Sequence, residues 1–391
     1  MRIAVVTNVL PPEGRGGAEH HVAVLAASLH DRGHEVTVLS GTRGDLDGPR
    51  VIPVPRSPDL RPEDSKRRKV TWHVVDLWRP DVHRRISGLL RRGGYDVVQT
   101  NSPQGLSSAV FSAVRVSRVP HVHMAHDYNA ICMRTSLTRD GEFCGGRCPE
   151  CRPQRLIRGG LLRRSAPKLI AATDYVRDRH VEAGVVAAGD AVTIPYGVRP
   201  GRTRVRQLRP GGALRLAYLG TLGAHKGVDV LLEAFRDAPA EWTLDIAGAG
   251  DLSDAVRAAA TTDPRITFRG FVQGPAKEQF LDDADVLVVP SVWQEPAGIV
   301  ALEATIRGLP FVVTDRGGLQ EMPGAVVAPA GKVRGLLDAL ANLASDGRLL
   351  ERSRVLLEQV PAPTLERNVA RVEQVLESVS RRSQADAGSV R

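Results

Sequence analysis

The stretch PSVWQEPAGIVALEATIRGLPFVVTDRGGLQE, residues 290–321, decides the fold class of this 391-residue chain. The apolar run at 285–289 just before it predicts a buried parallel strand, and the polar turn that follows carries Glu295. A helix is predicted to begin near Gly298, because an apolar helical pattern follows the turn. Glu303 then lies one to two turns inside that helix.

The start of this helix is predicted to hold a phosphate or diphosphate. The N–H groups of Gly298, Ile299 and Val300 have no partner inside the helix and lie at the positive end of its dipole. Glu303 would accept hydrogen bonds from two neighbouring hydroxyls, as on a ribose, and Glu295 would accept from hydroxyls beyond the diphosphate. The segment therefore suits a nucleotide-sugar. The alternative is an ordinary strand-to-helix unit with solvated glutamates.

Short apolar runs alternate with amphipathic helical patterns along the whole chain, which predicts parallel sheets with helices on both faces. In the first half, the predicted strands are 2–6, 35–39, 96–99, 121–124 and 168–172. In the second half, they are 214–219, 243–247, 266–268, 286–289 and 311–314. The resulting prediction is an α/β protein with two Rossmann-like, doubly wound domains and an interdomain cleft.

Domain boundaries follow from where this alternation pauses. We expect an N-terminal domain at 1–198, a C-terminal domain at 213–360 and, between them, a basic Pro/Gly-rich linker at 199–212. A last helical pattern occupies 361–383, and 384–391 is predicted to be a disordered tail.

The composition is that of a globular protein, with 42% hydrophobic and 25% charged residues. No apolar stretch reaches the roughly 20 residues that span a bilayer, and the chain enters a strand at once, so we expect a cytoplasmic protein without a signal peptide. The net charge of +9 would attract nucleic acid, anionic lipid or a phosphorylated substrate. The sign of the net charge alone does not indicate which of these partners binds.

Two further loops follow predicted strands and are rich in glycine. Gly16 and Gly17 lie in a loop that lets the backbone approach a ligand; a GxGxxG pattern from Gly14 would need glycine at Glu19, which counts against a dehydrogenase. In the second loop, Lys226 precedes a helix, where an ammonium group would neutralise a diphosphate without a metal ion. A tight turn and a surface lysine are the alternatives.

All four cysteines fall within 20 residues, at Cys132, Cys144, Cys148 and Cys151. In a cytosolic chain such a cluster favours a metal site or free thiols over disulfides. Four thiolates with one CxxC spacing would close a structural Zn²⁺ site, and free thiols are the alternative.

A basic run near residues 65–85 carries Trp72 and Trp78. It suits a helix docked on an anionic membrane or a solvated helix whose tryptophans are buried. No RNA or DNA motif accompanies it, so we expect no nucleic-acid partner.

These motifs together resemble the retaining GT-B glycosyltransferases of family 4 (glycosyl transferases group 1), in a subgroup with a cysteine-bearing loop at 132–151. The resemblance covers nearly the whole chain and implies that its last helix crosses back to the N-terminal domain. His126, at the end of a predicted strand, resembles the family's cleft histidine beside the donor sugar. Most relatives carry arginine where this chain has Thr221.

The resemblance implies a nucleotide-diphosphate-sugar donor and a hydroxyl acceptor, which would be a small molecule, a glycan or a lipid-linked molecule at the inner membrane surface. It implies catalysis without a metal cofactor and retention of anomeric configuration. The implied catalytic residues are His126, Lys226 and Glu295. The implied donor-binding residues are Gly16, Gly17, Thr221, Lys226, Glu295, Gly298, Ile299, Val300 and Glu303. A nucleotide-sugar epimerase on the same fold and a non-catalytic zinc-loop protein binding nucleic acid or membrane are the alternative functions.

Overall fold

The computed structural model describes residues 1–14, 16–44, 46–60, 64–139, 142–145, 148–345 and 347–388. The chain divides into two compact units. Unit 1 comprises Met1–Leu137, Cys144–Pro195 and Glu366–Arg391, and unit 2 comprises Thr138–Phe143 and Tyr196–Leu365.

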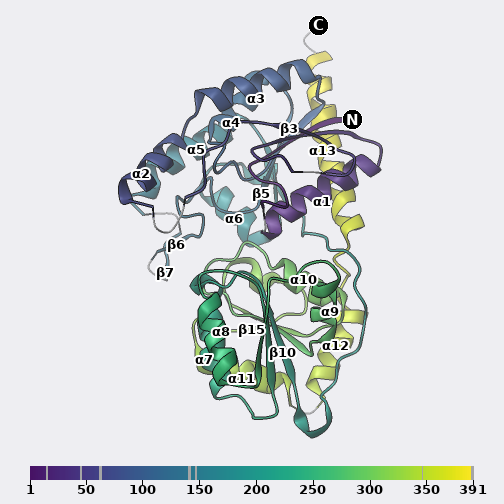
Figure 1. The fold of residues 1–391 in the computed structure, drawn as a ribbon. Coiled ribbons are helices and arrows are strands. Elements are labelled where there is room, and N and C mark those ends of the chain that lie inside the picture. The colour runs from purple at the N-terminus through teal and green to yellow at the C-terminus, as the bar shows by residue number, and fades with distance from the viewer. Residues whose placement is uncertain are drawn as a thin grey trace. The chain divides into compact units, whose positions relative to one another are not determined.

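Unit 1 is built on a parallel sheet with the strand order β3-β2-β1-β4-β5-β8-β9 (Figure 1). Its strands are β1 (Arg2–Thr7), β2 (Glu35–Ser40), β3 (Arg50–Pro53), β4 (Val97–Thr100), β5 (His121–Ala125), β8 (Lys168–Ala171) and β9 (Ala191–Thr193). Its helices are α1 (Gly17–Asp31), α2 (Lys66–Val75), α3 (Pro80–Gly93), α4 (Ala109–Ser117), α5 (Cys151–Arg164), α6 (Asp174–Glu182) and α13 (Leu365–Gly388). The central strands are buried along almost their whole length. β1 has the nearly continuous apolar sequence that such burial favours, whereas β4 and β5 also bury the polar side chains of Gln99, His121 and His123.

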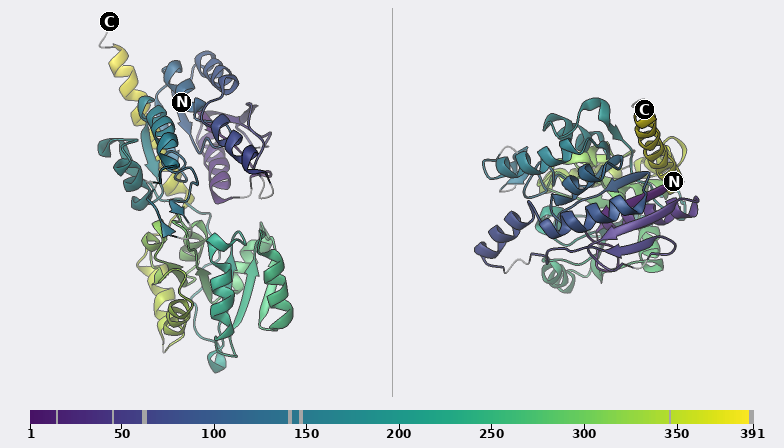
Figure 2. Two further views of the ribbon diagram at one scale, coloured as in Figure 1. Left: turned by 90° about the vertical axis from the view of Figure 1, so that its left-hand side faces the viewer. Right: turned by 90° about the horizontal axis from the view of Figure 1, so that it is seen from above.

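Unit 2 contains a second parallel sheet, with the order β12-β11-β10-β13-β14-β15. Its strands are β10 (Arg215–Leu219), β11 (Thr243–Ala247), β12 (Ile266–Gly270), β13 (Val286–Val289), β14 (Phe311–Thr314) and β15 (Val326–Ala328). Its helices are α7 (Val228–Arg236), α8 (Ser253–Thr262), α9 (Pro275–Asp283), α10 (Ile299–Ile306), α11 (Val333–Leu343) and α12 (Arg348–Glu358). Figure 2 shows helices on both faces of each sheet. The predicted α/β class is therefore confirmed.

Several short elements differ from the sequence prediction. The edge strands β3, β9 and β15 are three or four residues long and were not predicted. A small antiparallel hairpin, β6 (Thr138–Arg139) with β7 (Glu142–Phe143), also lacks a sequence signal. Edge strands are only partly buried, so their sequences carry a weak apolar pattern.

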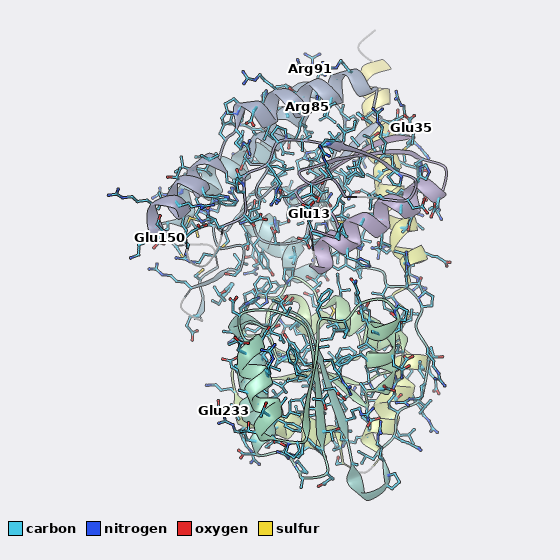
Figure 3. The ribbon with its side chains drawn as sticks, in the orientation of Figure 1. Glu13, Glu35, Arg85, Arg91, Glu150 and Glu233 are labelled. Atoms are coloured by element: carbon cyan, nitrogen blue, oxygen red, sulfur yellow. The ribbon has the colours of Figure 1, made fainter. Side chains whose placement is uncertain are left out.

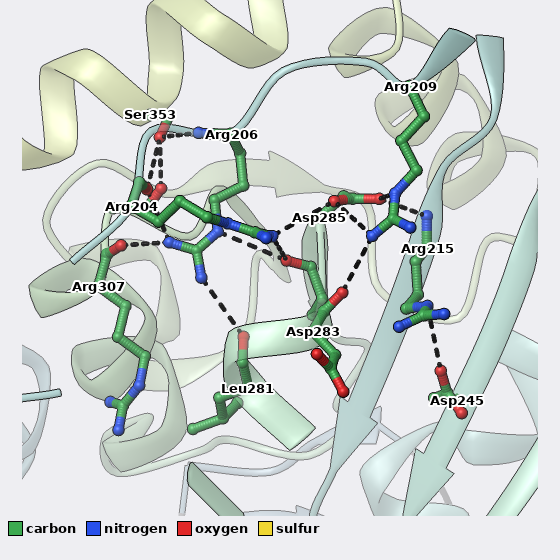
Figure 4. Close-up of polar contacts among 12 residues, drawn as sticks. Arg204, Arg206, Arg209, Arg215, Asp245, Leu281, Asp283, Asp285, Arg307 and Ser353 are labelled. Atoms are coloured by element: carbon green, nitrogen blue, oxygen red, sulfur yellow. Dashed lines mark hydrogen bonds and ion pairs between the residues drawn. The ribbon is translucent and has the colours of Figure 1, made fainter. Parts of the chain in front are cut away.

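The segment at 199–212, expected to be a linker, packs as an extended arm on unit 2. Arg206 is 1% exposed, and its guanidinium donates to the carbonyls of Arg204 (2.7 Å) and Arg307 (Figure 4). Arg209 pairs with Asp285 at 2.7 Å. Burial lowers the pKa of Arg206 to about 10. The arginines in this basic stretch thus anchor it, which its Pro/Gly-rich composition did not indicate.

Helix α13 belongs to unit 1. Val369, Val372 and Leu376 are buried along one face. On the same helix Glu373 accepts hydrogen bonds from Arg32 (2.6 Å) and His34 (2.6 Å). The helix continues to Gly388, past the predicted start of the tail at 384, because serine, arginine, glutamine and alanine in this stretch are compatible with a helix. Residues 389–391 lie outside the described residues.

Within the described part of the chain, no helix is both long enough and apolar enough to cross a membrane.

Candidate active site

The candidate donor site lies in unit 2, where the strand order reverses. β10 and β13 are neighbours and run parallel, although six elements separate them in the chain. The loops that leave their carboxyl ends therefore meet at one edge of the sheet. One of these loops leads into the short turn η3 (Ala224–Lys226), and the other carries Glu295 and leads into α10.

Lys226 and Glu295 form an ion pair across these two loops. The Lys226 Nζ lies 2.7 Å from Glu295 Oε1 and 3.0 Å from Oε2. Glu295 Oε2 also accepts from the Ser291 hydroxyl at 3.0 Å and from the Trp293 indole N–H at 2.5 Å. The side chains of Lys226 and Glu295 are 22% and 11% exposed. Two residues named separately from the sequence are thus brought into direct contact.

Glycines allow the loops around Glu295 to approach one another. Gly227 has φ +69°, and a Cβ there would lie 1.9 Å from the Pro290 carbonyl oxygen. Gly317 has φ +61°, and a Cβ there would lie 2.2 Å from the Glu295 carbonyl oxygen. The Gly318 N–H donates to that same oxygen at 2.7 Å. The Gly-Gly turn after β14 therefore holds the backbone that carries Glu295, a role that the sequence did not reveal.

Helix α10 begins directly after Gly298, close to the predicted start. Among the described residues, no hydrogen-bond acceptor is found for the N–H groups of Gly298, Ile299 and Val300. These groups are therefore available to an anion at the helix N-terminus.

Glu303 follows in the second turn of α10 and has a partner that sequence reasoning missed. The Lys277 Nζ, on α9, lies 2.5 Å from Glu303 Oε1. The two side chains are 27% and 14% exposed. Their pairing depends on how α9 packs beside α10, so no local pattern in the sequence could have indicated it.

Thr221 lies in the loop after β10 and is exposed. Its carbonyl accepts from the Tyr218 hydroxyl at 2.7 Å. Burial, followed by the charge of Glu295, raises the pKa of Tyr218. Tyr218 therefore stays neutral and holds the loop through this hydrogen bond.

In unit 1, His126 lies at the end of β5 beside the loop that follows β4. His126 Nε2 lies 2.9 Å from Asn101 Oδ1, while Asn101 Nδ2 donates to the Val6 carbonyl at 3.1 Å. Since the amide oxygen can only accept, His126 Nε2 carries the proton. Burial lowers the pKa of His126 to about 4, so the imidazole is neutral at pH 7.

A buried ion pair anchors the loop that follows β4. Asp76 and Arg158 are joined through their side chains, each 1% exposed. Asp76 Oδ1 accepts from the Gly105 N–H at 2.7 Å, and its carbonyl accepts from the Ser108 N–H at 3.1 Å. Neither residue was singled out from the sequence, because the partners are 82 residues apart.

Gly16 is the N-cap of α1, and Gly17 is its first residue. The Glu19 side chain, from the first turn, lies against this glycine loop: a Cβ on Gly16 would be 2.3 Å from Glu19 Oε2. A side chain at position 16 would therefore displace that carboxylate from its present place.

The four cysteines form no disulfide. Cys132, Cys148 and Cys151 are buried in one apolar cluster, and Cys144 is partly buried beside it. Burial raises the pKa of the Cys151 thiol, which also hydrogen-bonds Cys132. Across the described ranges, no three His, Cys, Asp or Glu side chains are arranged to hold a metal ion. The zinc site stays a prediction, which elemental analysis of the purified protein would test.

Comparison with known families gives two matches that follow each other along the chain. Residues 15–202 match the model described as "Glycosyltransferase Family 4", and residues 213–346 match "Glycosyl transferases group 1". A phosphatidyl-myo-inositol mannosyltransferase of Mycobacterium leprae is 28% identical over 86% of this chain and 86% of its own length. A glycogen synthase of Mycobacterium tuberculosis is 28% identical over 90% and 88%.

Solved structures share the fold at lower identity. HepE of Anabaena, solved in complex with UDP, gives a TM-score of 0.71 at 18% identity, over 97% of this chain and 100% of that one. A sucrose-phosphate synthase of Thermosynechococcus elongatus gives 0.73 at 19% identity, over 97% and 98%.

Proposed function

Since the chain is a glycosyltransferase with the GT-B fold, we propose that it transfers a sugar from a nucleotide-diphosphate-sugar to an acceptor hydroxyl, with retention of anomeric configuration. The observation that carries this proposal is the Lys226–Glu295 pair beside the start of α10. A cation, a carboxylate and N–H groups without an acceptor among the described residues lie there at the reversal point of a parallel sheet, where such sheets bind nucleotides. HepE, whose structures include complexes with UDP and UDP-glucose, supports a donor of this class.

In the proposed complex, the diphosphate lies at the N-terminus of α10. The Lys226 Nζ lies within hydrogen-bond distance of both Glu295 oxygens, and because an ammonium carries three N–H groups, it can also donate to a phosphate oxygen. The lysine and the N–H groups of Gly298, Ile299 and Val300 would together stabilise the negative charge that grows on the leaving diphosphate. Glu303 would hold the ribose hydroxyls, and Glu295 would hold the sugar.

The state of His126 supports front-face attack. An inverting enzyme needs a base on the face opposite the leaving group. His126 Nε2 already carries a proton for Asn101, and the low pKa of the ring makes it a weak base. The acceptor proton would instead pass to a phosphate oxygen as the new bond forms on the side from which the diphosphate leaves.

Thermal stabilisation by a panel of UDP-, GDP-, ADP- and dTDP-linked hexoses tests the donor class, because a ligand that binds only the folded state raises the melting temperature. Product formation that requires an acceptor excludes the epimerase. Salt-sensitive binding to nucleic acid or vesicles, without any response to a nucleotide-sugar, would instead favour the non-catalytic alternative.

We also propose that α2 contacts an anionic membrane. None of its residues is buried, and Val70 and Val74 are 63% and 60% exposed. Trp78, just after it, is 43% exposed, whereas Trp72 is partly buried and donates to the Pro58 carbonyl at 2.7 Å. The first turn of α2 is basic, and Figure 3 shows Arg85 and Arg91 along α3 of the same unit.

Apolar and basic side chains exposed together fit a lipid surface that carries negative charge. Co-sedimentation with phosphatidylcholine vesicles, with and without phosphatidylglycerol, tests this contact. We expect binding only to the anionic vesicles and its loss in Val74→Asp. Equal binding to both vesicles, or to neither, would contradict it.

A further inference from the structure

Trp293 makes two polar contacts with the candidate donor site. Its indole N–H donates to Glu295 Oε2 at 2.5 Å. Its ring faces Lys226, whose Nζ lies 4.9 Å from the ring centroid. The side chain thus touches both members of the ion pair, although neither the strand-to-helix pattern nor the resemblance gave it a role.

The hydrogen bonds to Glu295 are unevenly divided between its two oxygens. Among the described residues, Oε2 lies within hydrogen-bond distance of three donors, Lys226, Ser291 and Trp293, whereas Oε1 has Lys226 alone. A carboxylate has about four acceptor positions, two on each oxygen. Ser291 and Trp293 fill the two positions of Oε2, with the longer Lys226 contact in addition. The shorter Lys226 contact takes one position of Oε1, which keeps the other for a further donor such as a sugar hydroxyl.

The carboxylate cannot turn about its last bond without losing these contacts. Rotation out of the present carboxylate plane would move Oε2 away from the Ser291 hydroxyl and the Trp293 indole N–H. That bond is charge-assisted and comes from a rigid, half-buried ring. The backbone is held as well, since the Glu295 N–H donates to the Trp293 carbonyl at 2.9 Å.

We propose that Trp293 is a positioning residue for the donor sugar: its N–H group fixes Glu295 so that Oε1 faces the sugar, and its ring holds Lys226. This inference rests on the proposed function, because it assigns the open position on Oε1 to a hydroxyl of the donor. The two parts of the Trp293 side chain have separate effects on binding. The N–H group serves sugar recognition, and the ring serves the lysine and hence the diphosphate.

The experiment compares how tightly variants bind a nucleotide-sugar and the matching free nucleoside diphosphate, by calorimetry. The nucleotide-sugar is the one from the UDP, GDP, ADP and dTDP panel that stabilises the wild type most. Trp293→Phe keeps a ring over Lys226 but removes the N–H group, and Trp293→Leu removes both. Trp242→Phe is the matched control, because Trp242 is 2% exposed in the core of the same unit and outside the site.

Trp293→Phe should bind the nucleotide-sugar about 10-fold more weakly, the scale of one charge-assisted hydrogen bond, and the diphosphate within about twofold of wild type. Trp293→Leu should weaken the diphosphate as well, by about threefold, through loss of the cation–π contact. Trp242→Phe should change neither affinity. In a Glu295→Ala background, Trp293→Phe should have no further effect on the nucleotide-sugar, because its action passes through that carboxylate.

Three results would overturn the role of Trp293 and leave the proposed function standing. The first is an equal loss of affinity for both ligands in Trp293→Phe, and the second is no loss of affinity for either. The third is a full additional loss of nucleotide-sugar affinity when Trp293→Phe is added to Glu295→Ala. A wild type that binds no ligand in the panel would overturn the proposed function, and the assignment of Trp293 with it.

Discussion

At the scale of single residues, the two glutamates of the candidate site have different neighbours. Glu295 accepts from Lys226, Ser291 and Trp293. Glu303, on α10, instead pairs with Lys277 on α9. This difference fits a division of roles in which Glu303 binds the nucleotide and Glu295 acts on the sugar.

We expect Glu303→Gln to weaken binding of the free nucleoside diphosphate by about 10-fold, because a neutral amide accepts weaker hydrogen bonds from the ribose than a carboxylate does. Glu295→Gln should leave that affinity nearly unchanged and mainly slow transfer. Calorimetry with the diphosphate, together with the transfer rate, checks both statements. An equal loss of diphosphate affinity in the two variants would refute the division of roles.

Gly317→Ala should lower the transfer rate strongly, because the new Cβ would lie 2.2 Å from the Glu295 carbonyl oxygen and push the loop away. The variant should also lose about 1–3 kcal/mol of unfolding free energy from the strained backbone. Gly331→Ala is the matched control. Its φ of +68° is similar, but a Cβ there would meet only Val292, at 4.0 Å.

The control should therefore lose stability without losing the transfer rate. Denaturant unfolding and steady-state kinetics on both variants provide the comparison. If both variants keep wild-type kinetics, the Gly-Gly turn does not position Glu295.

At the scale of elements, β5 and the residue directly after it carry buried histidines that the fold keeps neutral. The Thr100 hydroxyl lies 2.8 Å from His121 Nε2 and 2.9 Å from His123 Nδ1. Burial lowers the pKa of His121 to about 3 and that of His126 to about 4, from a usual value of 6.5. His21, on α1, is likewise lowered to about 3.

The unfolded chain therefore binds protons below pH 6.5 that the folded chain does not bind. The free energy of unfolding should fall as the pH drops from 6.5 toward 4, by about 1.4 kcal/mol per pH unit for each such histidine. Urea unfolding between pH 7.5 and 5 measures this slope. His121→Gln should be less stable at pH 7.5. Its unfolding free energy should change less steeply with pH, by the amount that corresponds to about one proton. An unchanged slope in that variant would contradict the buried neutral state of His121.

The elements also show which features a sequence can predict. Strands such as β13 and β14, in the middle of their sheet, are nearly continuous apolar runs, and the predicted bounds of β11, β13 and β14 agree with the structure. The edge strands β3 and β15 are only four and three residues long, which is too short for an apolar pattern to distinguish them from the loops around them. In the site, Glu295 and Glu303 were found because they share one segment with α10. Lys277 was not, because its contact depends on tertiary packing.

At the scale of the whole molecule, the proposed chemistry uses cationic and N–H groups in place of a metal ion at the diphosphate. We therefore expect transfer to continue in the presence of EDTA, since Lys226 and the start of α10 stabilise the leaving group. The rate should be measured immediately after chelation and again after hours, so that slow removal of any structural zinc is recorded separately. Immediate loss of activity that Mg²⁺ or Mn²⁺ restores would contradict this expectation.

Retention of configuration is the central claim, because it follows from a diphosphate that both leaves and receives the acceptor proton at the start of α10. The most direct measurement is an NMR record of the first product formed from an α-linked donor, with water as the acceptor until a better one is found. The coupling constant of the anomeric proton identifies the product before it equilibrates. We predict an α product. A β product would show attack from the opposite face and would contradict both the mechanism and the roles given to Lys226 and Glu295.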